Sequence, residues 1–189
     1  MQSTCFDAIW HGTGNIAVAA PTGSGKTALF ELAIIALLCR NNSNIGKIVY
    51  LAPMRALAME RTADWRSKFK NLRVAAILGG DDASTQTRTS VENADIIITT
   101  PEKLDAMSRK WRDHRELLGQ IGLLCVDEVH LLGEPRGATL EAVITRCKMV
   151  SVMSDVISKG WPAANLRIVA LSATLPNLVD IAGMFKIYS

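Results

Sequence analysis

The chain carries, between its first apolar run and its first long helical pattern, the stretch Ala20-Pro21-Thr22-Gly23-Ser24-Gly25-Lys26-Thr27. Gly23 and Gly25 can adopt backbone angles that turn successive N–H groups inward, which makes a nest for an anion at a helix N-terminus. Lys26 adds a positive charge for the β- and γ-phosphates of a nucleotide, and the Thr27 hydroxyl can ligate Mg²⁺. The general pattern begins with glycine, whereas this chain has Ala20 there. Because a strand pattern precedes this loop and a helical pattern follows it, as in a phosphate-binding loop, we predict that the whole stretch, Ala20 included, binds ATP.

Short apolar runs alternate with helical patterns along the chain. The runs are nearly continuously apolar, as expected for strands that are covered on both faces: Asn15–Ala20, Lys47–Leu51, Arg73–Leu78, Asp95–Thr99, Leu123–Asp127 and Leu166–Leu171. Apolar residues recur at helical spacing in three longer segments: Thr27–Arg40, Ala56–Phe69 and Thr139–Val156. This alternation predicts an α/β fold with a mainly parallel sheet and helices on both faces. Ligands then bind at the carboxyl ends of the strands, and Asn41–Gly46 and Ser158–Asn165 are expected to be surface loops.

Composition and charge exclude several other classes of protein. The 189 residues, of which 49% are apolar and 21% charged, fit one globular domain and exclude a disordered chain. The longest apolar stretch contains Glu31 and is shorter than the roughly 20 residues that a membrane crossing needs, so no membrane partner is expected. A net charge of +3 permits a nucleic-acid partner without requiring one. The cysteines have no metal-binding or redox spacing and are expected to be buried, reduced thiols of an intracellular protein: Cys5, Cys39, Cys125 and Cys147.

A second polar motif, Asp127-Glu128-Val129-His130, follows the apolar run that begins at Leu123. Two adjacent carboxylates at a strand end are costly unless a cation lies beside them. Because the phosphate-binding loop is expected at the same edge of the sheet, we predict that Asp127 binds Mg²⁺ through water. Glu128 would then orient and deprotonate the water that attacks the γ-phosphate, so that Lys26, Asp127 and Glu128 carry the catalysis. His130 is either a coupling residue or a packed or capping histidine.

These two motifs, together with Ser172-Ala173-Thr174, resemble those of the superfamily-two DExH-box helicases. The resemblance covers essentially the whole chain and implies the first of the two RecA-like domains of such an enzyme, residues 1–189, within a larger helicase. It assigns Ser172 and Thr174, with His130, to coupling between ATP hydrolysis and strand movement. Gln2 resembles the glutamine with which this family reads adenine, although an exposed terminal glutamine is an equal alternative.

Other segments are similar to the nucleic-acid motifs of the same family. Arg55, in Ala52-Pro53-Met54-Arg55-Ala56-Leu57, and Thr100, in Thr99-Thr100-Pro101-Glu102-Lys103, would bind successive phosphates of one strand. Such contacts position a strand without reading its sequence. The alternative for Arg55 is a solvated residue at the start of a helix. Gly79-Gly80-Asp81 resembles the T-G-D turn of the family but departs from it at the first residue.

The stretches between the motifs resemble the Ski-type branch of these helicases. They are Phe30-Glu31-Leu32-Ala33-Ile34, Asp64-Trp65-Arg66-x-Lys68-Phe69, Ser108-Arg109-Lys110-Trp111-Arg112-Asp113 and Arg136-Gly137-Ala138-Thr139-Leu140-Glu141. Within that branch the likeness is to the Mer-type DNA helicases, which promote meiotic crossovers and work from 3′ to 5′. The resemblance implies action on single-stranded or branched DNA in the nucleus. By its residues alone, Arg109–Arg115 is a basic helix end with one tryptophan, as readily structural as nucleic-acid-binding.

Three functions stay open at this point. The first is a motor that hydrolyses ATP to move along DNA and open the duplex. The others are an RNA helicase of the same branch and a nucleotide-dependent clamp or remodeller that does not unwind. Because the chain ends soon after Ser172-Ala173-Thr174 and shows no second glycine- and arginine-rich half, we expect a fragment whose partner is a second RecA-like domain. That domain would bring the arginine finger, which can be worth about 10³–10⁵ in rate.

Overall fold

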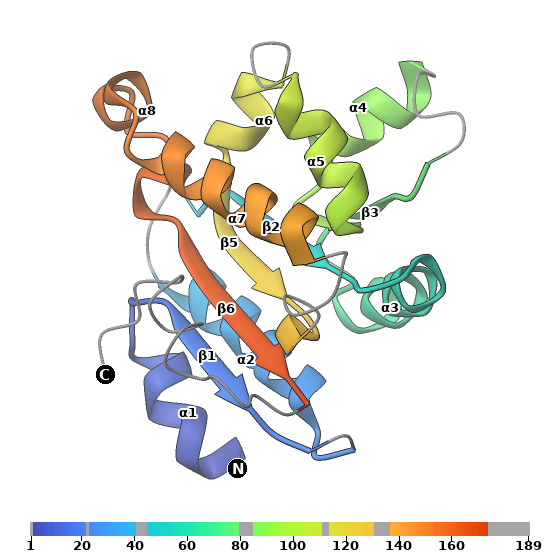
Figure 1. Cartoon of the computed structure of the whole chain (residues 1–189). Coiled ribbons are helices and arrows are strands. Elements are labelled where there is room, and N and C mark those ends of the chain that lie inside the picture. The colour runs from blue at the N-terminus through green and yellow to red at the C-terminus, as the bar shows by residue number, and fades with distance from the viewer. Residues whose placement is uncertain are drawn as a thin grey trace.

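The strands form one six-stranded, all-parallel sheet with the order β1-β6-β5-β2-β4-β3 (Figure 1). The computed structural model describes residues 2–21, 23–40, 45–79, 85–110, 114–130 and 137–173. The strands are β1 (Ile16–Ala19), β2 (Lys47–Leu51), β3 (Val74–Ile77), β4 (Ile96–Thr99), β5 (Ile121–Val126) and β6 (Arg167–Ser172). The prediction of an α/β fold with a parallel sheet is therefore confirmed.

Helices cover both faces of this sheet. They are α1 (Gln2–Trp10), α2 (Lys26–Cys39), α3 (Arg55–Lys68), α4 (Thr85–Asn93), α5 (Pro101–Arg109), α6 (Arg115–Gly119), α7 (Gly137–Ser151) and α8 (Ser154–Ser158), with the 3₁₀ turn η2 (Pro162–Asn165). In Figure 1, α5 and α7 lie on one side of the sheet, whereas α1 and α2 lie on the other. No helix among the described residues is both long enough and apolar enough to cross a membrane.

Alternate residues of each strand enter two separate cores. In β2, Ile48 and Tyr50 pack on the side of α1, α2 and α3, whereas Val49 and Leu51 pack on the side of α4 to α7. All four are at most 1% exposed. Because both faces are covered, the strands need apolar residues at successive positions, which is why they appear in the sequence as continuous apolar runs.

Hydrogen bonds beyond the regular sheet join the carboxyl ends of neighbouring strands. The Ala20 N–H donates to the Ser172 carbonyl at 3.0 Å, which joins the exit of β1 to β6. The Asp127 N–H donates to the Leu51 carbonyl at 3.2 Å, and the Ala52 N–H donates to the Thr99 carbonyl at 2.9 Å. The polar motifs that follow these strands therefore start from one edge of the sheet.

Two arginines fasten α1 to the rest of the domain. Arg167 at the start of β6 is 4% exposed and donates to the carbonyls of Ala8 and Ile9 at 2.9 Å and of Gly14 at 3.0 Å. Arg40, just after α2, donates to the Trp10 carbonyl at 3.1 Å. Carbonyls at a helix C-terminus lack partners within the helix, and these cations supply them. The helix that begins at Gln2 is thereby tied to both α2 and β6.

The structure corrects in part the prediction that Ser158–Asn165 is a surface loop. Pro162 and Ala163 are buried in the 3₁₀ turn, and Trp161 packs directly against Gly119. A Cβ on Gly119 would lie 2.0 Å from the Trp161 ring, so only glycine fits there. The apolar run Trp161–Ala164 packs against the core beside α7, whereas residues 158–160 and Asn165 are exposed.

Three other expectations are corrected or lie partly outside the described residues. Cys125 and Cys147 are buried free thiols as predicted, but Cys39 is exposed and Cys5 is half-buried, because the end of α2 and the face of α1 reach the surface. The helical pattern Thr139–Val156 is two helices, α7 and α8. Of the predicted loop Asn41–Gly46, residues 41–44 lie outside the described part of the chain.

Candidate nucleotide-binding site

The loop between β1 and α2 has the backbone conformation that its glycines suggested. Gly23 has φ 80° and Gly25 has φ 78°, both in the left-handed region that favours glycine. A Cβ added at Gly23 would find nothing within 4 Å, so the backbone angle and not crowding demands glycine there. The Ser24 N–H and hydroxyl both donate to the Pro21 carbonyl, at 3.3 and 2.5 Å, and fix the turn. Helix α2 then begins at Lys26; Thr22 lies outside the described residues.

The two carboxylates at the end of β5 are held differently. Asp127 accepts a hydrogen bond from the Tyr50 hydroxyl at 2.6 Å and another from the Glu128 N–H at 3.0 Å. Glu128 has φ 52°, and it is the only described non-glycine residue with a positive φ. Such a conformation costs about 1–3 kcal/mol and persists only where its surroundings impose it. The strained backbone turns the Glu128 carboxylate toward α2.

Burial raises the pKa of Asp127 above its ordinary value. The hydrogen bond from Tyr50 and the charge of Lys26 oppose this increase, whereas the negative charge of Glu128 adds to it. An aspartate in this position gains from a nearby cation, because a cation stabilises the ionised form. The electrostatics of Asp127 therefore fit a ligand of Mg²⁺.

Lys26 faces Glu128 across the site, with 3.7 Å between Lys26 Nζ and Glu128 Oε1. The Lys26 side chain is only 10% exposed, and its Nζ has no hydrogen-bond partner among the described residues. A buried ammonium without partners is costly, and phosphate oxygens would satisfy it. The described residues hold no cluster of three His, Cys, Asp or Glu that could bind a metal alone. Mg²⁺ is commonly bound by one or two carboxylates with phosphates and waters, which fits Thr27 and Asp127.

Two of the three predicted motifs meet where His130 approaches Ser172. The His130 Nδ1 lies 3.2 Å from Glu128 Oε2 and 3.4 Å from Ser172 Oγ. The imidazole therefore lies between the acidic pair on β5 and the end of β6. This geometry favours the coupling interpretation of His130 over that of a capping histidine. Thr174 lies outside the described residues.

Two side chains that contact the site were missed by the sequence reasoning. Tyr50, in the middle of β2, donates to Asp127, and Arg61, on α3, donates from Nη2 to Thr27 Oγ1 at 3.4 Å. The hydroxyl of a tyrosine inside an otherwise apolar strand was a signal, because a buried hydroxyl needs a partner. Arg61 gave no signal, since a cation on an amphipathic helix usually faces solvent.

The predicted nucleic-acid residues lie at the same edge of the sheet but farther along it. Arg55 is the exposed first residue of α3, directly after β2, and Thr100 is the half-buried N-cap of α5, directly after β4. In the strand order, β2 and β4 lie beyond β5 as seen from β1. The side chain of Gln2 lies outside the described part, as do Gly80 and Asp81.

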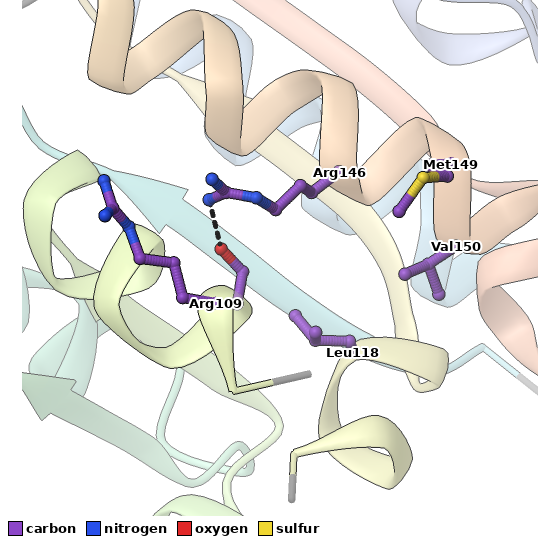
Figure 2. A pocket seen from close by; sticks show the side chains of 6 residues that line it. Arg109, Leu118, Arg146, Met149 and Val150 are labelled. Carbon is purple, nitrogen blue, oxygen red and sulfur yellow. Dashed lines mark hydrogen bonds between the residues drawn. The ribbon is translucent and has the colours of Figure 1, made fainter. Parts of the chain in front are cut away.

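A cavity of about 270 Å³ lies between α5, α6 and α7, away from the nucleotide edge (Figure 2). Its lining residues are Ser108, Arg109, Leu118, Arg146, Met149 and Val150. Arg146 donates to Ser108 Oγ at 3.0 Å, and Arg109 and Arg146 both pair with Asp105. Arg115 in turn pairs with Asp155. The described arginines of Arg109–Arg115 are thus engaged within the domain, which favours the structural interpretation of that segment.

Comparison with known proteins identifies the family. The sequence profile described as "DEAD/DEAH box helicase" matches residues 1–181. The chain belongs to this family. The family and the six-stranded parallel sheet confirm the expected RecA-like α/β fold.

Individual relatives of this helicase domain agree with the predicted branch. The chain is 41% identical to the ATP-dependent DNA helicase homolog MER3 of Arabidopsis thaliana, in an alignment that covers 99% of this chain. It is 43% identical to the probable ATP-dependent DNA helicase HFM1 of Homo sapiens over 96% of its length. It is 36% identical to the activating signal cointegrator 1 complex subunit 3 of Dictyostelium discoideum, also over 96%. The chain spans 17%, 13% and 8% of these relatives, respectively.

Proposed function

We propose that residues 1–189 are the first RecA-like domain of an ATP-dependent DNA helicase of the Mer type. In this proposal, ATP hydrolysis at the site drives 3′-to-5′ translocation and opens the duplex. The observation that carries it is the convergence of Lys26, Glu128 and His130 at one strand edge, within a chain whose relatives are named DNA helicases. A nucleic-acid motor needs these groups together, because hydrolysis must be sensed by the elements that move.

Each residue of the site has a separate task in this proposal. Lys26 and the N–H groups of the loop bind the phosphates, while Thr27 directly and Asp127 through water hold Mg²⁺. The metal ion, when bound, neutralises charge that develops on the phosphate oxygens. Glu128 orients the attacking water and accepts its proton. Gln2 contacts the adenine edge, and His130, Ser172 and Thr174 transmit the state of the nucleotide.

The nucleic-acid contacts lie beside this site. Arg55 and Thr100 bind successive phosphates of one DNA strand, which positions it without reading its bases. A second RecA-like domain of the same full-length protein closes over the nucleotide and supplies the arginine finger. By resemblance to the Mer type, the enzyme acts in the nucleus on single-stranded or branched DNA during meiotic crossover formation.

The test is a strand-displacement assay with the full-length protein. Duplexes with a 3′ or a 5′ single-stranded DNA tail, and matched duplexes with an RNA tail, are mixed with ATP and Mg²⁺. We expect DNA-stimulated hydrolysis and displacement only from the 3′-tailed DNA. Stimulated hydrolysis without displacement would identify a clamp or remodeller, and displacement only from RNA-tailed duplexes would identify an RNA helicase.

The isolated 189-residue chain provides a second measurement. It should bind ATP with Mg²⁺ weakly and hydrolyse it very slowly, because its cleft lacks the closing domain. DNA-stimulated turnover of this chain at the rate of a whole motor would contradict the proposed division of the site between two domains.

A further inference from the structure

Tyr50 and Arg61 hold the two side chains that are assigned to Mg²⁺. The Tyr50 hydroxyl donates to Asp127 Oδ2 at 2.6 Å, and Arg61 Nη2 donates to Thr27 Oγ1 at 3.4 Å. Arg61 also faces Tyr50: burial and Asp127 raise the pKa of Tyr50, whereas the Arg61 guanidinium opposes that increase. The Arg61 side chain is 13% exposed, so it is held in the interior between α3 and the nucleotide loop. Both metal-binding side chains are therefore contacted from β2 and α3.

A series of ion pairs from Arg61 to Glu31 fixes the position of Arg61. Arg61 Nη1 lies 3.0 Å from Asp64, Asp64 lies 3.1 Å from Lys68, and Lys68 lies 2.8 Å from Glu31 on α2. Glu31 also accepts a hydrogen bond from the Trp65 indole N–H at 3.2 Å. The two sequence stretches around Glu31 and around Asp64-Trp65, which carry the resemblance to the Ski-type branch, thus contact each other. They fix α3 against the helix that begins with the phosphate-binding lysine.

A cluster of aromatic rings between α2, β2 and α3 makes this arrangement rigid. The Tyr50 ring packs edge-on between Phe30 of α2 and Trp65 of α3, and its centroid lies 5.4 Å from that of Phe30 and 5.1 Å from that of Trp65. The Trp65 ring in turn packs against Phe69, with 5.9 Å between their centroids. Tyr50 and Trp65 are 0% exposed. Edge-to-face aromatic pairs resist sliding, so a displacement of α3 would move Tyr50 and Arg61 with it.

Helix α3 also begins with Arg55, six residues before Arg61. A helix of 14 residues moves as one body, so the position of its first residue affects the position of its middle. We propose that Tyr50 and Arg61 are positioning residues that orient Asp127 and Thr27 for Mg²⁺ and, through α3, couple that orientation to nucleic acid bound at Arg55. The coupling half of this inference rests on the proposed function.

The test measures two ratios of nucleotide affinity in the full-length protein with a fluorescent ADP analogue. The metal ratio compares the dissociation constant in EDTA with that in Mg²⁺, and the DNA ratio compares it without and with saturating single-stranded DNA. Tyr50→Phe keeps the ring packing and removes only the hydroxyl, so its metal ratio should fall about 10-fold or more. Arg61→Gln should lower the metal ratio several-fold and bring the DNA ratio close to one, and Arg61→Lys should restore part of both.

Arg66→Gln is the matched control, because Arg66 lies on the same helix and, among the described residues, donates only to the Val74 carbonyl, at 3.1 Å. A purely structural loss affects both states of a variant equally and cancels in each ratio, so this control should keep the wild-type ratios. Wild-type ratios in Arg61→Gln and Tyr50→Phe, or equal changes in Arg66→Gln, would overturn the inference. If the unmodified protein itself has a DNA ratio of one and shows no DNA-stimulated hydrolysis, the proposed function and the coupling are both wrong. The metal ratios of the variants still decide whether Tyr50 and Arg61 are positioning residues.

Discussion

Two aspartates in this domain have opposite electrostatic environments. Asp105 on α5 is 6% exposed, and although its burial alone would raise its pKa, hydrogen bonds from Arg146 and Arg109 lower it. Asp127 after β5 accepts no hydrogen bond from an arginine among the described residues, and burial raises its pKa. The charge of Asp105 is therefore neutralised by arginines within the domain, whereas that of Asp127, at the nucleotide edge, is not.

The difference separates a stabilising region from a functional one. At the interface of α5 and α7, Asp105 forms ion pairs with Arg109 and Arg146, and both arginines line the neighbouring cavity (Figure 2). The carboxyl edge instead holds a strained Glu128 and a Lys26 ammonium with no hydrogen-bond partner among the described residues. Strain and unmet polar groups cost stability, and they persist in proteins chiefly where a ligand uses them.

The largest effect should come from Glu128→Gln at the carboxyl edge. The amide keeps the shape of the side chain but cannot accept a proton, so DNA-stimulated ATP hydrolysis should fall about 10²–10⁴-fold. Nucleotide affinity, measured by titration with a fluorescent analogue, should hold. Lys26→Ala is the comparison, since removing the charge that faces the phosphates should weaken binding itself. Equal loss of binding in both variants would refute the separate roles.

Asp105→Ala should show the opposite pattern. Removing this buried partner leaves Arg146 unpaired, so the free energy of unfolding should drop by about 2–3 kcal/mol. Urea titration measures the loss. Nucleotide affinity should be unchanged, because Asp105 lies between α5 and α7 and not at the strand edge.

The pH dependence of that loss provides a check on its origin. Because the folded-state pKa of Asp105 is lowered, its contribution is fully present above the unfolded pKa and is lost as pH falls through the folded value. The stability difference between wild type and Asp105→Ala should therefore be constant near neutral pH and shrink below about pH 4. A difference that stayed constant into acid would point to lost packing and not to lost charge.

Asp127→Asn should make the domain slightly more stable while removing its function. The folded state raises the pKa of Asp127, so keeping it ionised at neutral pH costs free energy that a neutral amide does not. We expect a small gain in the free energy of unfolding in urea titration at pH 7, which disappears in acid, together with loss of Mg²⁺-dependent nucleotide binding. A destabilised Asp127→Asn would mean that the carboxylate is structural, as Asp105 is.

The smallest expected effect is a change in single-strand DNA binding, and it should distinguish two arginines outside the nucleotide site. Arg55→Ala should weaken single-strand binding about equally for all sequences and reduce the salt slope by roughly 0.7, because one phosphate contact is lost. Arg109→Ala, at the edge of the cavity, should leave the slope unchanged, since Arg109 pairs with Asp105. ATP affinity without DNA should hold in both. An unchanged slope in Arg55→Ala would make Arg55 a structural residue at the start of α3.

Local patterns predicted the strands well and some helices poorly. The run Lys47–Leu51 agrees with β2 residue for residue, because a strand covered on both faces is apolar throughout. The start of β5 was placed two residues late, since Gly122 interrupts the apolar run. A Cβ at Gly122 would lie 2.3 Å from the Ile45 carbonyl oxygen, so this glycine serves a close backbone approach that no local pattern reveals. Helix α4 was missed because its polar sequence lacks apolar periodicity.

The chemistry expected at the nucleotide edge follows from short segments of the sequence. The glycines that need positive φ, the lysine and threonine that follow them, and the adjacent acids after an apolar strand all lie within single short segments. Their roles depend on local backbone conformation and on side-chain chemistry, and both can be read from neighbouring residues.

The distant groups that contact that edge come together through the fold of the whole chain. Tyr50 and Asp127 are 77 positions apart, Arg61 and Thr27 are 34 apart, and Ser172 and His130 are 42 apart. Each pair meets because the sheet order places β5 between β6 and β2, with α2 and α3 on one face. Periodicity shows that a residue faces the interior, but the partner that it finds there depends on strand order and helix packing, which arise from contacts summed over the whole chain.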